Sequence, residues 1–421
     1  MKTAGIICEY NPFHNGHKKQ LAYAHEVLGC DAVICAMSGD FVQRGQPAIL
    51  DKYSRAASAL RNGADLVLEL PVSSVLSSAE GFAFGGVRLL AAAGADALVF
   101  GARYPDPDLY RMVADILREE PPRFQASLRK HISEGYSFPH ARALALQEEL
   151  SGKIDHLKDF LLSPNDMLGI EYRKALDLIH STMDFCPMKR VGADYYEEGI
   201  QRDTASASYI RGLFSNQMQL SGVLKQLSNV LPEDSLKCLE NGRTKHTLLY
   251  PDDLSSLLNY QLLMKKNLNK DFINPASIGS VKTKNADDFY NRLQKNRFNF
   301  RTFNERADLL KSKNITRTHI CRLFCRTILE LGPEIHDEKP RYLRVLGFTE
   351  KGRELLPQIR EGSSLPIVVN PGSDRKKLSE SAKRQLDKDL RASELCRMLR
   401  EEKSGLHFPS ESQRRFSPIP E

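Results

Sequence analysis

Short apolar runs alternate with helical segments over the first hundred residues. The runs span residues 4–8, 31–37, 65–70 and 95–101. A helical pattern over residues 52–62 separates two of them. Short buried strands alternating with helices are typical of βαβ units, so the pattern predicts an α/β fold with a Rossmann-like, doubly wound parallel sheet. Ligands bind such sheets beyond the carboxyl ends of the strands, where residues 9–14 and Gly101 follow the first and fourth runs.

The pattern changes beyond residue 101. Helical segments are predicted over residues 108–117, 122–134 and 139–150, and 188–191 is a further strand candidate. From about residue 220 the chain is helical and polar, and a charged helical run covers residues 379–403. We therefore predict a catalytic α/β domain over 1–220 and a mainly helical C-terminal domain over 221–403. Residues 404–421 lack periodicity, and we expect them to form a disordered tail.

Composition narrows the function classes only modestly. The 421 residues carry a net charge of +7, which permits an anionic partner without requiring one. The eight cysteines include no CxxC motif and so indicate neither a zinc clamp nor a disulfide framework, and no metal-ligand set stands out. No apolar stretch reaches membrane-spanning length, and the start of the chain does not match a signal peptide. We expect a cytoplasmic protein without a membrane partner.

The most informative motif follows the first apolar run. The sequence Asn11-Pro12-Phe13-His14-Asn15-Gly16-His17 breaks that strand at a proline and then opens a helix. Two imidazoles and the first amides of the helix are thereby placed where the phosphates of a nucleotide could sit. This layout is typical of an enzyme that works at the α-phosphate of ATP. Two histidines three residues apart are also common by chance, so the interpretation depends on the rest of the chain.

Two further helix starts carry candidate ligands. Ser163-Pro164-Asn165 begins a helix and leaves the Asn165 amide free at its mouth. Ser206, Ser208 and Arg211 bring two hydroxyls and a cation to another helix start, where they could hold β- and γ-phosphates. Simple helix capping explains the serines and the Ser-Pro-Asn start equally well.

Four blocks of sequence together carry a family resemblance. They are EYNPFHNGH at residues 9–17, MSGDFVQRGQPA at 37–48, PNDMLG at 164–169 and YLRVLGF at 342–348. The HxGH turn resembles that of the nucleotidyltransferase superfamily. The four blocks, which extend the similarity to about residue 400, resemble the bacterial tRNA(Met) cytidine acetate ligase family. One departure is that residues 205–208 read Ala-Ser-Ala-Ser, without the adjacent hydroxyl pair usual in the second superfamily signature.

The resemblance implies a ligase that works in two steps. Acetate and ATP give acetyl-adenylate, and the acetyl group then passes to N4 of the wobble cytidine of elongator tRNA(Met), giving N4-acetylcytidine. Magnesium is expected to accompany ATP, but no carboxylate cluster identifies protein ligands for it. The ATP-binding residues implied by the family are Ile7, Cys8, Glu9, Tyr10, Asn11, Pro12, Phe13, His14, Asn15, Gly16, His17, Lys18, Lys19, Gln20, Gly101, Asn165 and Arg190.

Physical roles can be given to several of these residues. Charge builds on the phosphate oxygens when acetate attacks the α-phosphorus, so positioning and electrostatics are expected to carry the rate. We predict His14 and His17 as the catalytic hydrogen-bond donors to phosphate, Gly16 and Gly101 as positions of close backbone approach, and Arg190 as a fixed cation. Further candidate contacts to phosphate or substrate are Ser38, Arg44, Ser206, Ser208 and Arg211. A capping loop with solvated charges is the alternative for Ser38 and Arg44.

The C-terminal half supplies candidate contacts to tRNA. Residues 301–360 hold thirteen Lys and Arg against eight Asp and Glu. Arg317, Arg322 and Arg326 fall near one helical face by their spacing. A basic helical surface beside an adenylating site suits contact with a tRNA backbone, although a solvated face is the usual origin of such charge.

Two other functions compete with the ligase. A small-molecule cofactor nucleotidyltransferase would share the HxGH site but would not need a long, basic, helical second half. A non-catalytic RNA-binding protein could retain a relict nucleotide fold. The presence of His14, Gly16, His17, Asn165 and Arg190 argues against the relict.

Overall fold

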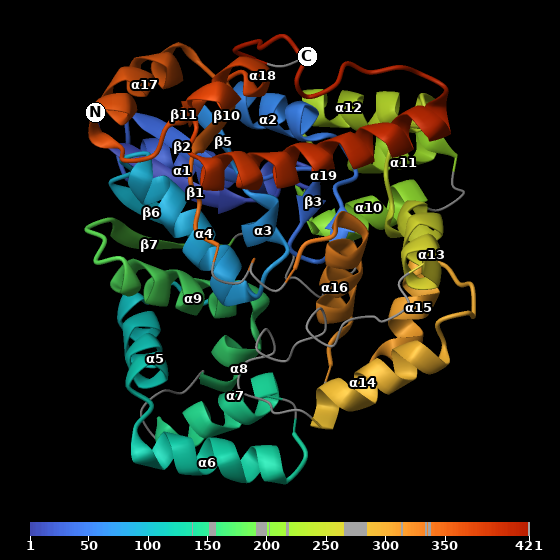
Figure 1. Cartoon of the computed structure of the whole chain (residues 1–421). Helices are drawn as coiled ribbons and strands as arrows, with labels where there is room; N and C mark the ends of the chain where they lie inside the picture. The colour runs from blue at the N-terminus through green and yellow to red at the C-terminus, as the bar shows by residue number, and fades with distance from the viewer. Residues whose placement is uncertain are drawn as a thin grey trace.

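A mostly parallel sheet forms the centre of the computed structural model (Figure 1). The structure describes residues 1–136, 138–150, 157–190, 200–201, 203–215, 219–264, 284–312, 315–332, 335 and 338–419. Within these residues the main sheet has seven strands in the order β11-β10-β5-β2-β1-β6-β7. The strands are β1 (Thr3–Cys8), β2 (Ala32–Ser38), β5 (Leu66–Leu70), β6 (Ala97–Ala102), β7 (Asp184–Lys189), β10 (Leu343–Phe348) and β11 (Ile367–Val368). All neighbouring pairs are parallel except β10 with β5.

The sheet is doubly wound, as the sequence predicted. From β1 the chain proceeds outward through β2 to β5, and helices α1 (Asn15–Glu26) and α2 (Lys52–Arg61) pack on one face. It then returns through α4 (Ala79–Ala92), which covers the opposite face, to β6 on the other side of β1. The strand order therefore reverses between β1 and β6, and their carboxyl ends form the crevice where such folds bind ligands.

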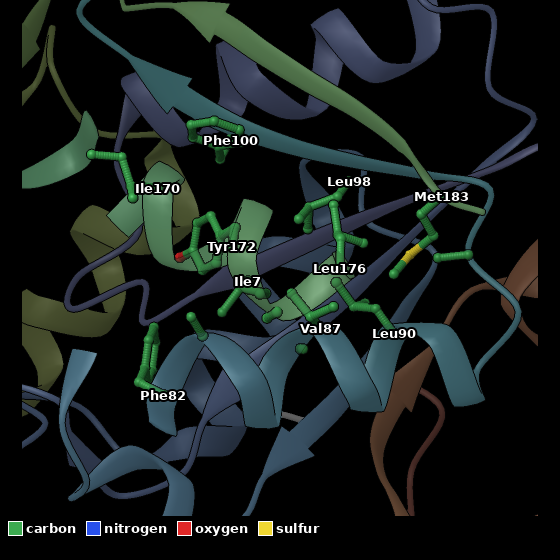
Figure 2. Close-up of a cluster of buried hydrophobic side chains, with 14 of the residues drawn as sticks. Ile7, Phe82, Val87, Leu90, Leu98, Phe100, Ile170, Tyr172, Leu176 and Met183 are labelled. Atoms are coloured by element: carbon green, nitrogen blue, oxygen red, sulfur yellow. The ribbon is translucent and has the colours of Figure 1, made fainter. Parts of the chain in front are cut away.

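Helices α4 and α9 (Pro164–Leu178) pack tightly on this second face. Figure 2 shows the resulting cluster around Ile7 of β1, with Leu98 and Phe100 of β6 beside it. A Cβ on Gly86 of α4 would lie 2.6 Å from Ile7 Cδ1, so glycine allows the close approach of helix to strand. Full burial of each large apolar side chain contributes about 1.5–3 kcal/mol, which makes this layer a rigid base for the crevice.

The remaining elements surround this sheet (Figure 1). The helices are α3 (Val72–Val75), α5 (Pro107–Glu119), α6 (Pro122–Ser133), α7 (Phe138–Glu149), α8 (Leu157–Leu162), α10 (Ala207–Ser215), α11 (Leu220–Leu227), α12 (Glu233–Thr244), α13 (Ser255–Met264), α14 (Lys284–Lys295), α15 (Phe303–Leu310), α16 (Arg317–Leu329), α17 (Glu350–Gly362), α18 (Pro371–Asp374) and α19 (Glu380–Ser404). Two short ribbons pair β3 (Phe41–Val42) with β4 (Gln46–Pro47), and β8 (Ile200–Gln201) with β9 (Thr204–Ala205). No described helix combines the length and apolar character needed to cross a membrane.

Two predicted boundaries differ from the structure. The strand expected at 188–191 is β7, which begins four residues earlier, and residue 191 lies outside the described residues. The predicted separation at residue 220 is also wrong, because β10 and β11 complete the sheet of the first half and α19 packs against α3. Residues 221–403 are thus mainly helical but share one sheet with the N-terminal part. The two halves form a single framework around the crevice.

The C-terminal segment is ordered as far as residue 419, contrary to the expected disorder. Its Glu411 carboxylate accepts a hydrogen bond from the Tyr53 hydroxyl at 3.0 Å and pairs with Lys52 at 2.9 Å and Arg344 at 3.0 Å. Burial opposes ionisation of Glu411, but the two cations outweigh it and hold the pKa of the carboxyl below its ordinary value. Glu411 shares both cations with Glu69, which pairs with Lys52 at 2.9 Å and with Arg344 at 3.5 Å, and it thereby anchors this polar segment to α2 and β10.

Candidate functional site

The two histidines of the HxGH motif lie at the first turn of α1, directly beyond β1. His14 is the N-cap residue, and its Nδ1 accepts a hydrogen bond from the Gly16 backbone N–H at 3.1 Å. His17 Nδ1 accepts in turn from the His14 backbone N–H at 3.3 Å. The two rings stack with their centroids 3.6 Å apart and their planes 18° apart. Each imidazole is thus fixed through one nitrogen to the start of the helix.

Hydrogen bonding sets the tautomer of both rings, and burial with nearby positive charge sets their protonation state. A neutral imidazole whose Nδ1 accepts carries its proton on Nε2, which is then a donor. Burial and the nearby charge of Arg190 lower the pKa of His14 to about 3. Burial, followed by the charges of His14 and Arg190, lowers the pKa of His17 well below its ordinary value. Near neutral pH the pair therefore offers two uncharged Nε2–H donors rather than two cations.

Gly16 is needed between the histidines for a steric reason. A Cβ at this position would lie 2.9 Å from Cε1 and 3.1 Å from Nδ1 of the His14 ring. Such a contact would push the ring away from its bond to the helix start. The tight spacing of the motif is therefore explained by the geometry of the His14 cap.

Three arginines give the crevice a positive charge. Arg190 follows β7, and its charge acts on both histidines. Arg211 of α10 donates from Nη1 to the Asn11 backbone oxygen at 2.6 Å. Burial, with the nearby charge of Arg44, lowers the pKa of Arg211 to about 10, so it stays protonated at neutral pH. Positive charge at this end of the sheet favours an anionic ligand.

The loop that carries Arg44 is tied to the end of β1. The Gln43 backbone N–H donates to Glu9 Oε1 at 2.7 Å. Buried Arg55 donates to the backbone oxygens of Glu9 at 2.6 Å and Ser38 at 3.1 Å, which joins the ends of β1 and β2. The Asn11 Oδ1 accepts from the Ile49 backbone N–H at 2.9 Å. This network places the loop beside the crevice.

The other wall is formed by β6 and the start of α9. A Cβ on Gly101 would lie 3.1 Å from Arg190 Cγ, so glycine leaves room for the arginine stem. Asn165, at the first turn of α9, makes no hydrogen bond with the described residues and keeps its amide available. Buried Asp166 beside it accepts from the Arg103 backbone N–H at 3.0 Å and from the Tyr110 hydroxyl. Sequence reasoning gave Asp166 no role, yet it fixes the loop that follows β6.

Several predicted site residues serve as structural supports. Asn15 Nδ2 donates to the backbone oxygens of residues 203 and 229, and Gln20 Nε2 donates to that of Val99. Lys19 pairs with Asp203 at 2.8 Å, whereas Lys18 is exposed. Buried members of the predicted set belong to the core or its edge: Ile7, Cys8, Tyr10, Pro12 and Phe13. The motif therefore combines the two histidines with residues that hold them in place.

The predicted serine ligands do not point to phosphate binding. Ser206 Oγ accepts from the Tyr209 backbone N–H at 3.2 Å, which is the capping alternative. Ser208 Oγ accepts from Arg211 Nη2 at 3.2 Å. Ser38 has no exposed surface, so its expected contact with substrate is wrong for this structure. Arg211, which also donates to the Asn11 backbone oxygen, stays the predicted anion contact of this group.

The three arginines expected to contact tRNA do not form a basic surface. Arg326 is 5% exposed within α16, and burial lowers its pKa to about 10. Arg322 donates to the Gln43 backbone oxygen at 3.2 Å, and Arg317 pairs with Asp308 at 2.7 Å. The prediction is wrong for Arg326 because the described helix contacts α13, α15 and α19 and has little free face.

Comparison with known proteins identifies the family. The model of the HIGH Nucleotidyl Transferase family matches residues 1–408. A tRNA(Met) cytidine acetate ligase of Halothermothrix orenii is 35% identical over 99% of this chain and 97% of its own length. The enzyme of the same name from Clostridium perfringens is 38% identical over 87% of this chain and 89% of its own length. The chain belongs to the tRNA(Met) cytidine acetate ligase family.

Solved structures of the family have the same fold. Thermotoga maritima TmcAL in its apo form I has a TM-score of 0.84 and 32% identity, covering 100% of this chain and 98% of that one. TmcAL from the same organism bound with alpha-thio ATP has a TM-score of 0.82 and 34% identity, covering 95% of each chain. A family member with the same fold thus binds an ATP analogue.

Proposed function

We propose that this protein is an ATP-dependent acetate ligase that acetylates N4 of the wobble cytidine of elongator tRNA(Met). The observation that carries the proposal is the pair of neutral, helix-fixed histidines at the switch between β1 and β6, surrounded by arginines. This arrangement offers donors and positive charge to a triphosphate in a chain of the acetate ligase family. For an enzyme with a tRNA substrate we expect a cytoplasmic location.

In the first step an acetate oxygen attacks the α-phosphorus of ATP, and the bond to the bridging oxygen of pyrophosphate breaks. The products are acetyl-adenylate and pyrophosphate. The Nε2–H groups of His14 and His17 donate to phosphate oxygens as charge builds on them, without having to transfer a proton. Arg190, Arg211 and Arg44 balance the charge of the departing pyrophosphate. The reaction needs little covalent chemistry from the protein, so the fixed geometry of these groups supplies the rate.

Other residues position the nucleotide. Asn165 offers its free amide to the nucleoside, and the loop held by Asp166 borders the same wall. Gly101 and Gly16 keep space for the arginine stem and the His14 ring, respectively. Magnesium would arrive with ATP, held by its phosphates. The described residues contain no group of three or more His, Cys, Asp or Glu side chains that would hold a metal ion.

In the second step N4 of the cytidine attacks the acetyl carbonyl carbon. The bond to the adenylate oxygen breaks, AMP leaves, and N4 loses a proton as the amide forms. The base must enter the crevice to reach the adenylate, which requires the wobble nucleotide to be unpaired. An anticodon loop meets this requirement because its bases can be turned outward.

Acetate-dependent exchange of labelled pyrophosphate into ATP tests the proposal. We expect exchange that requires acetate, and a His17→Ala variant should lose most of it while keeping its fold. Glu26→Ala is the control, because Glu26 is an exposed residue at the end of α1 and lies outside the predicted ATP-binding set. Absence of both exchange and tRNA acetylation in the wild-type protein would refute the proposal.

A further inference from the structure

Large apolar side chains are exposed together at the end of α13 and on the loop between α14 and α15. Phe298 and Phe300 of this loop are 63% and 66% exposed, and Tyr260 of α13 is 59% exposed. Leu263 and Met264 of α13 are also exposed and share a helical face with Tyr260. These helices gather on the side of the molecule opposite β6 and β7 (Figure 1).

Buried polar groups hold the loop against α13. Arg297 donates to the backbone oxygens of Leu262 at 2.5 Å and Leu263 at 3.0 Å. Arg306 is fully buried and donates to the backbone oxygens of Asn296 at 3.0 Å and Asn299 at 2.6 Å. Since these bonds flank both phenylalanines, the exposed rings sit on a fixed loop. Two buried guanidinium groups thus hold in place a loop whose apolar rings are exposed to water.

The charge around these rings favours an anionic partner. Residues 289–304 contain no Asp or Glu and include four arginines or lysines, of which Lys295 and Arg301 are exposed. The described part of α13 carries no charged residue at all. Exposed aromatic rings flanked by cations suit unpaired nucleotides, whose bases stack and whose phosphates attract positive charge. An ordinary apolar protein interface would not require the cations.

These rings are connected to the crevice through α16. Helix α16 packs against α13 and α15, and its backbone at Cys321 and Arg322 lies so close to Gly45 that no Cβ could fit there. Gly45 follows Arg44, whose charge reaches Arg211. The aromatic surface and the nucleotide crevice therefore belong to one packed unit.

We propose that Phe298, Phe300 and Tyr260 form a stacking surface for unpaired nucleotides of the substrate tRNA, with Lys295 and Arg301 contacting the adjoining phosphates. The identity of the RNA rests on the proposed function; the stacking of unpaired bases rests on the surface itself. This surface takes the place of the arginines of α16 that the sequence had suggested as tRNA contacts.

The test measures binding of a fluorescently labelled anticodon stem-loop of tRNA(Met) by anisotropy. The Phe298→Ala/Phe300→Ala double variant should weaken binding about tenfold or more, because both rings on which bases stack are removed. The Phe298→Tyr/Phe300→Tyr double variant keeps both rings, and its affinity for the stem-loop should stay within about twofold of wild type. Leu178→Ala is the matched control, because Leu178 is an equally exposed apolar side chain on α9, outside the proposed surface.

Two further measurements make the outcome decisive. A blunt RNA duplex should bind the wild-type and double-alanine proteins equally, because its bases are not free to stack. Equal stem-loop affinity of these two proteins would overturn the inference, as would an equal loss for the duplex or a change of oligomeric state on light scattering. Acetate-dependent pyrophosphate exchange without tRNA should be unchanged in all variants. Its absence in the wild type would count against the proposed function, while the stem-loop comparison would still decide the stacking surface.

Discussion

His14 is predicted to have two separable duties, capping α1 through Nδ1 and donating to phosphate through Nε2. The change His14→Asn tests this separation. An Asn side chain can accept the Gly16 N–H bond in place of Nδ1, since Asn is a good N-cap residue, but it has no group at the position of Nε2. His14→Ala removes both functions. The two variants should therefore share a catalytic defect and differ in stability.

The structure sets the expected magnitudes. Removing one preorganised donor to a developing oxyanion costs about 10²–10³-fold in kcat, so both variants should lose activity in this range. Losing the stacked ring beside His17 should cost about 0.5–1.5 kcal/mol of stability in both variants. Loss of the cap should cost His14→Ala about 1 kcal/mol more.

Acetate-dependent pyrophosphate exchange and urea unfolding measure the two effects. Full activity in His14→Asn would refute the role given to Nε2. Equal stabilities of the two variants would refute the role given to the cap. A free energy of unfolding unchanged from wild type in both would show that neither the cap nor the stacking contributes.

The low pKa of His14 predicts how the exchange rate and the stability depend on pH. With a folded pKa of about 3, His14 stays neutral above pH 5, so it should cause no inflection in the exchange rate near pH 6.5. The unfolded chain takes up this proton near pH 6.5, hence the unfolded state binds more protons between pH 6.5 and 3. Stability from this group is complete above pH 6.5 and is lost as the pH falls towards 3. His14→Asn should show a shallower loss of stability over that range.

Three other changes test the supports of the site. Glu411→Gln should lower the free energy of unfolding in urea titrations by less than the about 3–5 kcal/mol of a fully broken buried ion pair, because Lys52 and Arg344 lose one of their two shared carboxylates and keep Glu69. Glu402→Gln, at an exposed acid, should leave it unchanged. Asp166→Asn should raise the KM for ATP more than it lowers kcat, because it loosens the loop after β6, and an unchanged KM would argue against that role. Gly101→Ala should weaken ATP binding several-fold in calorimetry by displacing the neighbouring arginine stem, whereas Gly362→Ala, which meets open space, should have no effect.

The parts of the fold predicted from sequence are those specified locally. The apolar runs that became β1, β2, β5 and β6 are short, uninterrupted and bounded by helix signals, so their type and order can be read directly. β10 was missed as a strand because it pairs with β5 from far along the chain, within a stretch dominated by helices. Because the partner strand lies far away in the sequence, this pairing leaves no hydrophobic periodicity that a local window could detect. The start of β7 was missed because Asp184 and Pro187 are uncommon in strands, and this strand lies at the sheet edge where they are tolerated.

In the candidate site, too, residues identified by their own chemistry were predicted, whereas roles that depend on tertiary contacts were missed. The histidines and Arg190 were predicted because their residue types suit phosphate chemistry; the structure brings them together, and their roles stay a prediction. The role of Asp166 was missed because an acid in the first turn of a helix is explained by the helix dipole alone. Arg326 was misplaced because helical spacing predicts which residues share a face but not whether that face is covered. For Asp166 and Arg326 the role depends on burial in the tertiary structure, which local sequence does not specify.

The central claim is tested most directly by the product formed on tRNA. Purified protein would be incubated with ATP, isotopically labelled acetate and tRNA(Met), and the digested nucleosides would be analysed by mass spectrometry. The account predicts labelled N4-acetylcytidine that requires ATP and acetate and disappears when the wobble cytidine is replaced by uridine. Unmodified cytidine at that position, with the protein folded and all substrates present, would contradict it.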